Sequence, residues 1–133
     1  MWAISTMCSA TTYHLPGAKF VAVAIAIVGG GTIVAGVLAF RRDSTTVNPL
    51  KPDRTESIVV HGIYRFTRNP MYLGIALILV GCAMYLANIA ALLVIPAFVA
   101  YMTQFQIKPE ERALLKKFGR TYAEYTASVG RWV

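Results

Sequence analysis

Two short stretches of this chain carry side chains suited to binding a charged ligand. The first is His61-Gly62-Ile63-Tyr64-Arg65-Phe66-Thr67-Arg68-Asn69-Pro70-Met71-Tyr72, which sets two arginines and three aromatic residues directly before a long apolar run. A guanidinium grips an anion with two parallel hydrogen bonds, and an aromatic ring offers its face to a cation. The stretch therefore suits a ligand that is part charged and part planar.

The same residues also have a purely structural interpretation. Asn69 is a suitable N-cap, and Pro70 is suited to the first position of a helix. Arginine and tyrosine are common anchors at the membrane interface. A role in membrane topology alone therefore stays open.

The second stretch is Glu110-Glu111, in the first turn of an amphipathic helix that we predict over about 109–127. At 100° per residue, Glu111 falls in the middle of the apolar face and Glu110 at its flank. A carboxylate that points toward lipid or protein needs a cation or hydrogen-bond donors, which predicts a ligand or a buried partner. The alternative is that both acids only complement the positive end of the helix. The apolar face comprises Leu114, Leu115, Phe118, Tyr122 and Tyr125, and the opposite face Arg112, Lys116, Arg120 and Glu124.

Composition places the chain in a membrane. With 133 residues, 56% hydrophobic and 14% charged, it is too apolar to hide its side chains in one small soluble core. The net charge of +7 comes from basic residues that flank apolar runs, which favours lipid headgroups over nucleic acid. Cys8 and Cys82 suggest no disulfide framework, and His14 and His61 are too isolated to predict a metal site.

The apolar runs predict three transmembrane helices and one domain over residues 1–133. The spans are expected at about 16–40, 71–87 and 89–107, with a tight turn at Asn88 between the last two. Pro96 should kink the third span. Ala18, Ala22, Ala26 and Gly30 form a stripe of small residues that lets another helix approach closely, including one from a second copy of the chain. The triplet 29–31, three glycines, is a place where the first span can bend.

The basic residues predict the orientation of these spans. Only Lys19 of thirteen lies outside the loop after the first span and the tail after the third, so both should face the cytoplasm, with Asn88 on the opposite side. Residues 1–4 resemble the end of an apolar helix, and we therefore expect a missing or truncated fourth helix at the N-terminus. The remaining basic residues are Arg41, Arg42, Lys51, Arg54, Arg65, Arg68, Lys108, Arg112, Lys116, Lys117, Arg120 and Arg131.

The two stretches together resemble the isoprenylcysteine carboxyl methyltransferase family and the related phospholipid methyltransferases. The similarity covers about residues 45–133 and includes two motifs separated by a two-span hairpin. These are Gly62-x-Tyr64-Arg65-x-x-Arg68-Asn69-Pro70-Met71-Tyr72-x-Gly74 and Glu110-Glu111-x-x-Leu114-x-x-x-Phe118-Gly119-x-x-Tyr122-x-x-Tyr125.

The resemblance implies an all-α integral membrane methyltransferase that uses S-adenosylmethionine at the cytoplasmic face, with a lipophilic or lipidated substrate from the bilayer. It assigns cofactor contacts to Tyr64, to the segment 69–72 with Asn69, Pro70 and Tyr72, and to one of Glu110 and Glu111. By charge, a glutamate suits the ammonium or ribose of the cofactor, and Arg68 or Arg65 its carboxylate. Arg65 is also a candidate for contacting the substrate.

Two departures from the family pattern bear on the substrate. The usual Arg-His-Pro is Arg68-Asn69-Pro70 here, so a titratable ring becomes an amide. The prenylcysteine enzymes tend to carry an arginine before the glutamates, where this chain has Gln106-Ile107-Lys108. A carboxylate, thiol or amine acceptor therefore stays open. A nicotinamide-dependent membrane reductase and a non-catalytic membrane adaptor are the alternative functions.

Overall fold

Every regular element in the described part of the chain is a helix. The computed structural model describes residues 16–42 and 58–133. The all-α prediction is confirmed for these residues, whereas the expected helix before the first span and the basic residues Lys51 and Arg54 lie outside them. In chain order the elements are α2 (Ala18–Arg42), η3 (Gly62–Arg65), α3 (Pro70–Tyr85), α4 (Ile89–Leu92), α5 (Val94–Tyr101), η4 (Met102–Ile107), α6 (Lys108–Phe118) and α7 (Arg120–Ser128).

Helix α2 is the one described helix that is long and apolar enough to cross a membrane by itself. It has 25 residues, and its most apolar stretch has a mean hydropathy of 2.4, with 17% of that stretch buried within the protein. At about 1.5 Å per residue it exceeds the roughly 30 Å of a bilayer core. The glycine triplet at 29–31 leaves the helix continuous. The first predicted span is therefore present nearly as expected, displaced by two residues.

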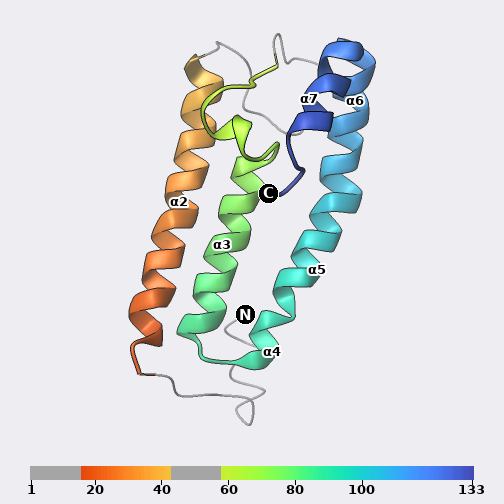
Figure 1. Ribbon diagram of the computed structural model, residues 1–133. Coiled ribbons are helices and arrows are strands. Elements are labelled where there is room, and N and C mark those ends of the chain that lie inside the picture. The colour runs from red at the N-terminus through yellow and green to blue at the C-terminus, as the bar shows by residue number, and fades with distance from the viewer. Residues whose placement is uncertain (1–15, 43–57) are drawn as a thin grey trace.

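Helices α2 and α3 pack with their backbones almost in contact. A Cβ atom placed on Gly29 would lie 2.6 Å from the carbonyl oxygen of Gly74, and one on Gly81 would lie 2.7 Å from that of Ala22. Because later residues of α2 meet earlier residues of α3, the two helices run antiparallel, as Figure 1 shows. At Gly29, Gly74 and Gly81 a side chain would prevent so close an approach, which is why glycine occupies them.

The small residues that make this contact overlap only partly with the predicted stripe, because Ala22 and Ala26 lie beside α3 and Gly30 does not. Ala22, Gly29 and Gly36 are buried, at a spacing of seven residues, whereas a Cβ atom on Gly30 would meet open space. A four-residue step drifts by about 40° around a helix with 3.6 residues per turn, so a stripe at that spacing turns away from its neighbour. The buried small residues of α2 serve a contact within the chain. Self-association through the predicted stripe stays a prediction.

The predicted turn at Asn88 is confirmed. Helix α3 ends at Tyr85, Ala87 has a positive φ of 48°, and Asn88 is fully buried. The Oδ1 atom of Asn88 accepts a hydrogen bond of 3.3 Å from the backbone amide of Ala91. A polar side chain in an apolar run thus marks the start of the second arm.

The second arm is divided into α4, α5 and the π-helix η4 rather than built as one helix. The break between α4 and α5 falls at Leu93, just before Pro96. Proline lacks an amide hydrogen and its ring crowds the carbonyl four residues earlier, which is Leu92 here. The kink predicted from Pro96 is therefore present, although the π-helix was not predicted.

The prediction of a single tail helix over 109–127 is wrong in two respects. Helix α6 continues from η4 instead of starting at Pro109, and Gly119 separates it from α7. Gly119 has φ 54° and ψ −123°, a conformation that glycine adopts at little cost. This residue turns the chain back toward α3.

The turn at 86–88 and the two glutamates lie at opposite ends of the bundle. In Figure 1 the end of α2, the start of α3 and helices α6 and α7 lie at the top, with the 86–88 turn at the bottom. At the top, Phe40 and Tyr64 pack edge to face with ring centroids 5.3 Å apart, beside Ala39 and Val59. Lys19 lies at the lower end, over the ring of Tyr85.

The close approach of α2 and α3 predicts a strong difference between two glycine substitutions. In Gly74→Ala the added Cβ atom would lie 2.5 Å from the carbonyl oxygen of Gly29, so the helices must separate. We expect a loss of about 1–3 kcal/mol in stability. Gly30→Ala should be neutral or stabilising by up to about 1 kcal/mol. Melting temperatures in detergent measure both changes, and equal melting temperatures for the two variants would contradict this packing.

Candidate functional site

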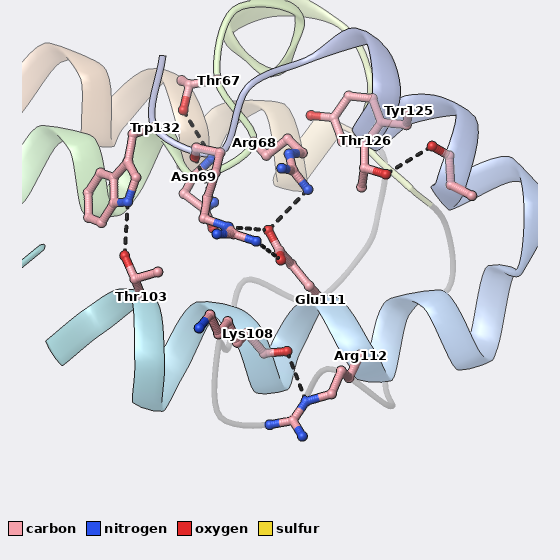
Figure 2. A network of polar contacts seen from close by, with 12 residues as sticks. Thr67, Arg68, Asn69, Thr103, Lys108, Glu111, Arg112, Tyr125, Thr126 and Trp132 are labelled. Atoms are coloured by element: carbon pink, nitrogen blue, oxygen red, sulfur yellow. Dashed lines mark hydrogen bonds and ion pairs between the residues drawn. The ribbon is translucent and has the colours of Figure 1, made fainter. Parts of the chain in front are cut away.

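Three parts of the chain meet at the upper end of the bundle. They are the loop 66–69 with the start of α3, the junction of η4 with α6, and residues 130–133, which we call the strap. Figure 2 shows Glu111 pointing from α6 toward Arg68, and the indole of Trp132 pointing toward Thr103 of η4. The first two parts hold the predicted site residues except Tyr64 and Arg65, which lie in η3, and the strap was not predicted.

Two arginines share the carboxylate of Glu111. Arg131 binds it with both Nε, 2.9 Å from Oε1, and Nη2, 2.7 Å from Oε2. Arg68 Nη1 lies 3.0 Å from Oε1. The side chains of Arg68 and Glu111 are only 12% and 16% exposed, so water screens the Arg68–Glu111 pair weakly. The predicted need of Glu111 for a cation is thus met from within the chain.

Glu110 has a different environment from its neighbour. Its Oε1 accepts hydrogen bonds from Tyr72 Oη at 3.0 Å and from Gln106 Nε2 at 2.9 Å, and both donors are neutral. No cation of the described residues forms an ion pair with it. Burial raises the pKa of Glu110 above its ordinary value of 4.5, against the two hydrogen bonds that lower it, and Glu111 adds to the rise. Glu110 is therefore the carboxylate that lacks a positive partner.

Asn69 and Pro70 start α3 as predicted, but the Asn69 side chain does not cap the helix. Its Nδ2 donates to the carbonyl of Arg131 at 2.8 Å, while its backbone amide donates to Thr67 Oγ1 at 3.1 Å. The proposed capping role of this side chain is therefore wrong. Pro70 is buried and occupies the first helical position, next to Gly36.

Three further tyrosines lie on η3 and α7. Tyr64 and Tyr122 are buried, and Tyr125 Oη donates to the carbonyl of Tyr64 at 2.7 Å. Burial raises the pKa of Tyr64, Tyr122 and Tyr125, and they therefore remain protonated at neutral pH. The contact between Tyr125 and Tyr64 joins α7 to η3.

The structure brings some predicted residues together and separates one. Tyr72 contacts Glu110 and Arg68 contacts Glu111, so two neighbouring sets of contacts meet at adjacent residues of α6. Arg65 is exposed at the end of η3, and within the described residues no hydrogen bond or ion pair joins it to the glutamates. The Nε atom of Arg68 is buried without a partner among the described residues.

Sequence reasoning missed Arg131 and Trp132 and gave Gln106 no positive role. The position of Gln106 four residues before Glu110 is a usable signal, because such pairs are neighbours on a helix. Arg131 lies 20 residues from Glu111, beyond the turn at Gly119, where periodicity carries no information. Trp132 Nε1 donates to Thr103 Oγ1 at 3.1 Å, across 29 residues.

The raised pKa of Glu110 predicts a specific dependence of stability on pH. The folded protein holds this proton at pH values where the unfolded chain has lost it, so stability should fall as pH rises above about 4.5 and level off above the folded pKa. Glu110→Gln should remove this part of the fall, whereas Glu124→Gln, at an exposed acid, should keep it. Melting temperatures between about pH 4.5 and 8 test this. Parallel curves for wild type and Glu110→Gln would contradict it.

The sequence of this chain is similar to those of a known family and of several known proteins. The model of the phospholipid methyltransferase family matches residues 18–121, from α2 to the start of α7. An uncharacterized protein of Haemophilus influenzae is 41% identical over 63 residues, which are 47% of this chain and all of that protein. No solved structure matches the chain.

Two named plant proteins are also similar. Protein-S-isoprenylcysteine O-methyltransferase A of Arabidopsis thaliana is 30% identical over 107 residues, 80% of this chain and 54% of that protein. A probable protein-S-isoprenylcysteine O-methyltransferase of Oryza sativa subsp. indica is 29% identical over 114 residues, 84% of this chain and 58% of that protein. The chain thus spans little more than half the length of these two relatives.

Proposed function

The chain belongs to the phospholipid methyltransferase family, and we propose that it transfers a methyl group from S-adenosylmethionine to a lipophilic acceptor at the cytoplasmic face of a membrane. The plant relatives named as isoprenylcysteine methyltransferases support this class of reaction. The family match does not favour the membrane reductase or the adaptor. The acceptor group is a carboxylate, thiol or amine.

The unequal environment of the two glutamates carries the proposal. Glu111 is already neutralised by Arg68 and Arg131, whereas Glu110 is half-buried with neutral donors alone. A half-buried carboxylate without a cation gains most from a ligand that brings a positive charge or hydroxyl donors. S-Adenosylmethionine carries an ammonium, a sulfonium and a ribose diol, and Glu110 is the residue that we expect to bind the ammonium or the ribose.

The other residues around Glu110 fit the remaining groups of the cofactor. The unpartnered Nε atom of Arg68 suits an acceptor such as the cofactor carboxylate. Tyr72 holds Glu110 through its hydroxyl and offers the ring face to a cation or to adenine. Tyr64 lies deeper, against Phe40, so we assign it to supporting this wall.

When bound, the cofactor supplies a methyl group that is already activated. The protein therefore needs to orient the two reactants and to exclude water, and no nucleophilic side chain is required. Gln106 and Tyr72 fix the direction of the Glu110 carboxylate from two elements, η4 and α3. An amine acceptor would additionally need a proton acceptor.

We expect Glu110→Gln to lose affinity for S-adenosylmethionine by about 1.5–3 kcal/mol, or roughly 10- to 150-fold, because a half-buried charged hydrogen bond is lost. The apo protein should be no less stable, since the substitution also removes an uncompensated charge. Glu124→Gln, whose acid is exposed and pairs with Arg120, is the matched control. Calorimetry in detergent measures the affinity.

Two measurements on the wild-type protein test the proposed function as a whole. Wild-type protein should bind S-adenosylmethionine and not reduced nicotinamide, and it should transfer radiolabelled methyl groups to a component of native lipid extract. Label in a base-labile product indicates an ester, and label in a stable product an amine or thioether. Binding of neither cofactor by wild-type protein would refute the proposal.

We also propose that the chain crosses the membrane three times, with α2, α3 and the arm from α4 to η4 as the spans. Helix α3 has 16 residues, about 24 Å at 1.5 Å per residue, so the bilayer must thin slightly around it. The excess of basic residues at the upper end supports a cytoplasmic location for the glutamates.

Cysteine labelling tests this topology. In a chain without Cys8 and Cys82, a cysteine at exposed Tyr85 should react with a membrane-impermeant reagent only from the outer side. A cysteine at exposed Arg120 should react only from the cytoplasmic side. Reaction of both from the same side would contradict the three-span arrangement.

A further inference from the structure

The strap contacts three parts of the site, which are the loop 66–69, α6 and η4. The Gly130 carbonyl accepts from the Arg68 amide at 3.0 Å, and the Arg131 carbonyl accepts from Asn69 Nδ2 at 2.8 Å. The Arg131 guanidinium binds Glu111 of α6 through two nitrogens. Trp132 binds Thr103 of η4. The strap therefore connects the loop before α3 to η4 and to α6, the helix that carries both glutamates.

Arg131 lies at the centre of these contacts. Two of its three guanidinium nitrogens are on Glu111, and its carbonyl holds the Asn69 side chain that would otherwise be free to cap α3. Arg120 offers the contrast, because it is 91% exposed and pairs with Glu124 within α7. Arg120 thus connects no separate elements, whereas Arg131 joins the loop 66–69 to α6.

This arrangement also decides which acid is available to a ligand. Arg68 and Arg131 together place two positive charges on the one carboxylate of Glu111. Without Arg131, Glu111 would keep a single cation and could compete with Glu110 for a cationic ligand. With Arg131, Glu111 is held toward the strap, and Glu110 is the acid without a cation.

We propose that Arg131 is a positioning residue of the methyl-transfer site, which fixes Glu111, Arg68 and Asn69 so that Glu110 alone is left to bind the cationic part of the cofactor. This role rests on the proposed function. Arg131 acts through Glu111 and the loop and does not itself contact the cofactor.

The test combines single and double substitutions with two measurements. Arg131→Gln should weaken binding of S-adenosylmethionine by about ten-fold, because Glu111 loses its two-nitrogen partner and the strap, whose carbonyls hold the loop, loses its attachment to α6. In a Glu111→Gln background the same substitution should add less than about two-fold, since both changes break one contact. Arg131→Lys keeps the charge but loses the two-nitrogen geometry, so its affinity should fall between those of wild type and Arg131→Gln. Arg120→Gln is the matched control and should bind as wild type does.

The second measurement is hydrogen exchange in the absence of cofactor. The Arg68 amide, bonded to the Gly130 carbonyl, should exchange faster in Arg131→Gln than in wild type or Arg120→Gln. A general loss of fold would instead speed exchange in α2 and α3 as well, and would lower the melting temperature.

The outcomes separate this inference from the proposed function. If wild-type protein fails to bind S-adenosylmethionine, the proposed function is refuted and this role with it. If wild type binds S-adenosylmethionine and both Arg131→Gln and Arg131→Lys bind it as tightly as wild type does, only the positioning role is refuted. A full loss that persists in the Glu111→Gln background would show direct contact with the cofactor and would also refute it. If Arg131→Gln does not fold, Arg131→Lys decides by the same comparison.

Discussion

Two guanidinium groups share one carboxylate at Glu111, and the arrangement of the site depends on this contact. Arg68 precedes α3, Glu111 lies in the first turn of α6, and Arg131 follows α7. Each group is at least partly buried, so the loss of one member would leave the others with charge that water compensates poorly. The contact therefore joins three elements at this end of the bundle, where the apolar cluster of Ala39, Val59 and Tyr64 joins α2 to η3.

The neighbouring acid shows what this contact makes possible. Glu110 is one residue away, yet it faces Tyr72 and Gln106 rather than arginine. Adjacent residues on a helix point about 100° apart, so one carboxylate faces the strap and the other faces α3. A pair of like residues thus divides into a structural member and one suited to a ligand. This division supports a cofactor site of the kind that the family relationship implies.

The sequence predicted those features that depend on local physics. The length of α2, the turn at Asn88 and the kink before Pro96 follow from apolar length, a buried polar group and a missing amide hydrogen. The need of Glu111 for a cation followed from its place on an apolar face. The identity of that cation did not, because Arg131 reaches it only after Gly119 has turned the chain.

The other differences have similar causes. The small-residue contact of α2 follows a seven-residue spacing, which the more obvious four-residue pattern concealed. The π-helix η4 has no signal in residue type, and Asn69 fits an N-cap in sequence while its side chain bonds elsewhere. Sequence patterns within one helix thus predicted features of that helix. They did not predict which residues of separate elements contact one another.

The long-range contacts of α7 and the strap also imply an order of events during synthesis. The residues joined by the Asn69–Arg131 bond are 62 positions apart, and those joined by the Tyr125–Tyr64 bond are 61 apart. Because a chain leaves the ribosome from its N-terminal end, α2 and α3 are complete well before Arg131 has been made. The loop before α3 can therefore form its bonds with the tail only after the tail has emerged and folded back over it. Helices α2 and α3 are therefore made first, and the pair of glutamates acquires its final surroundings only after Arg131 has been made.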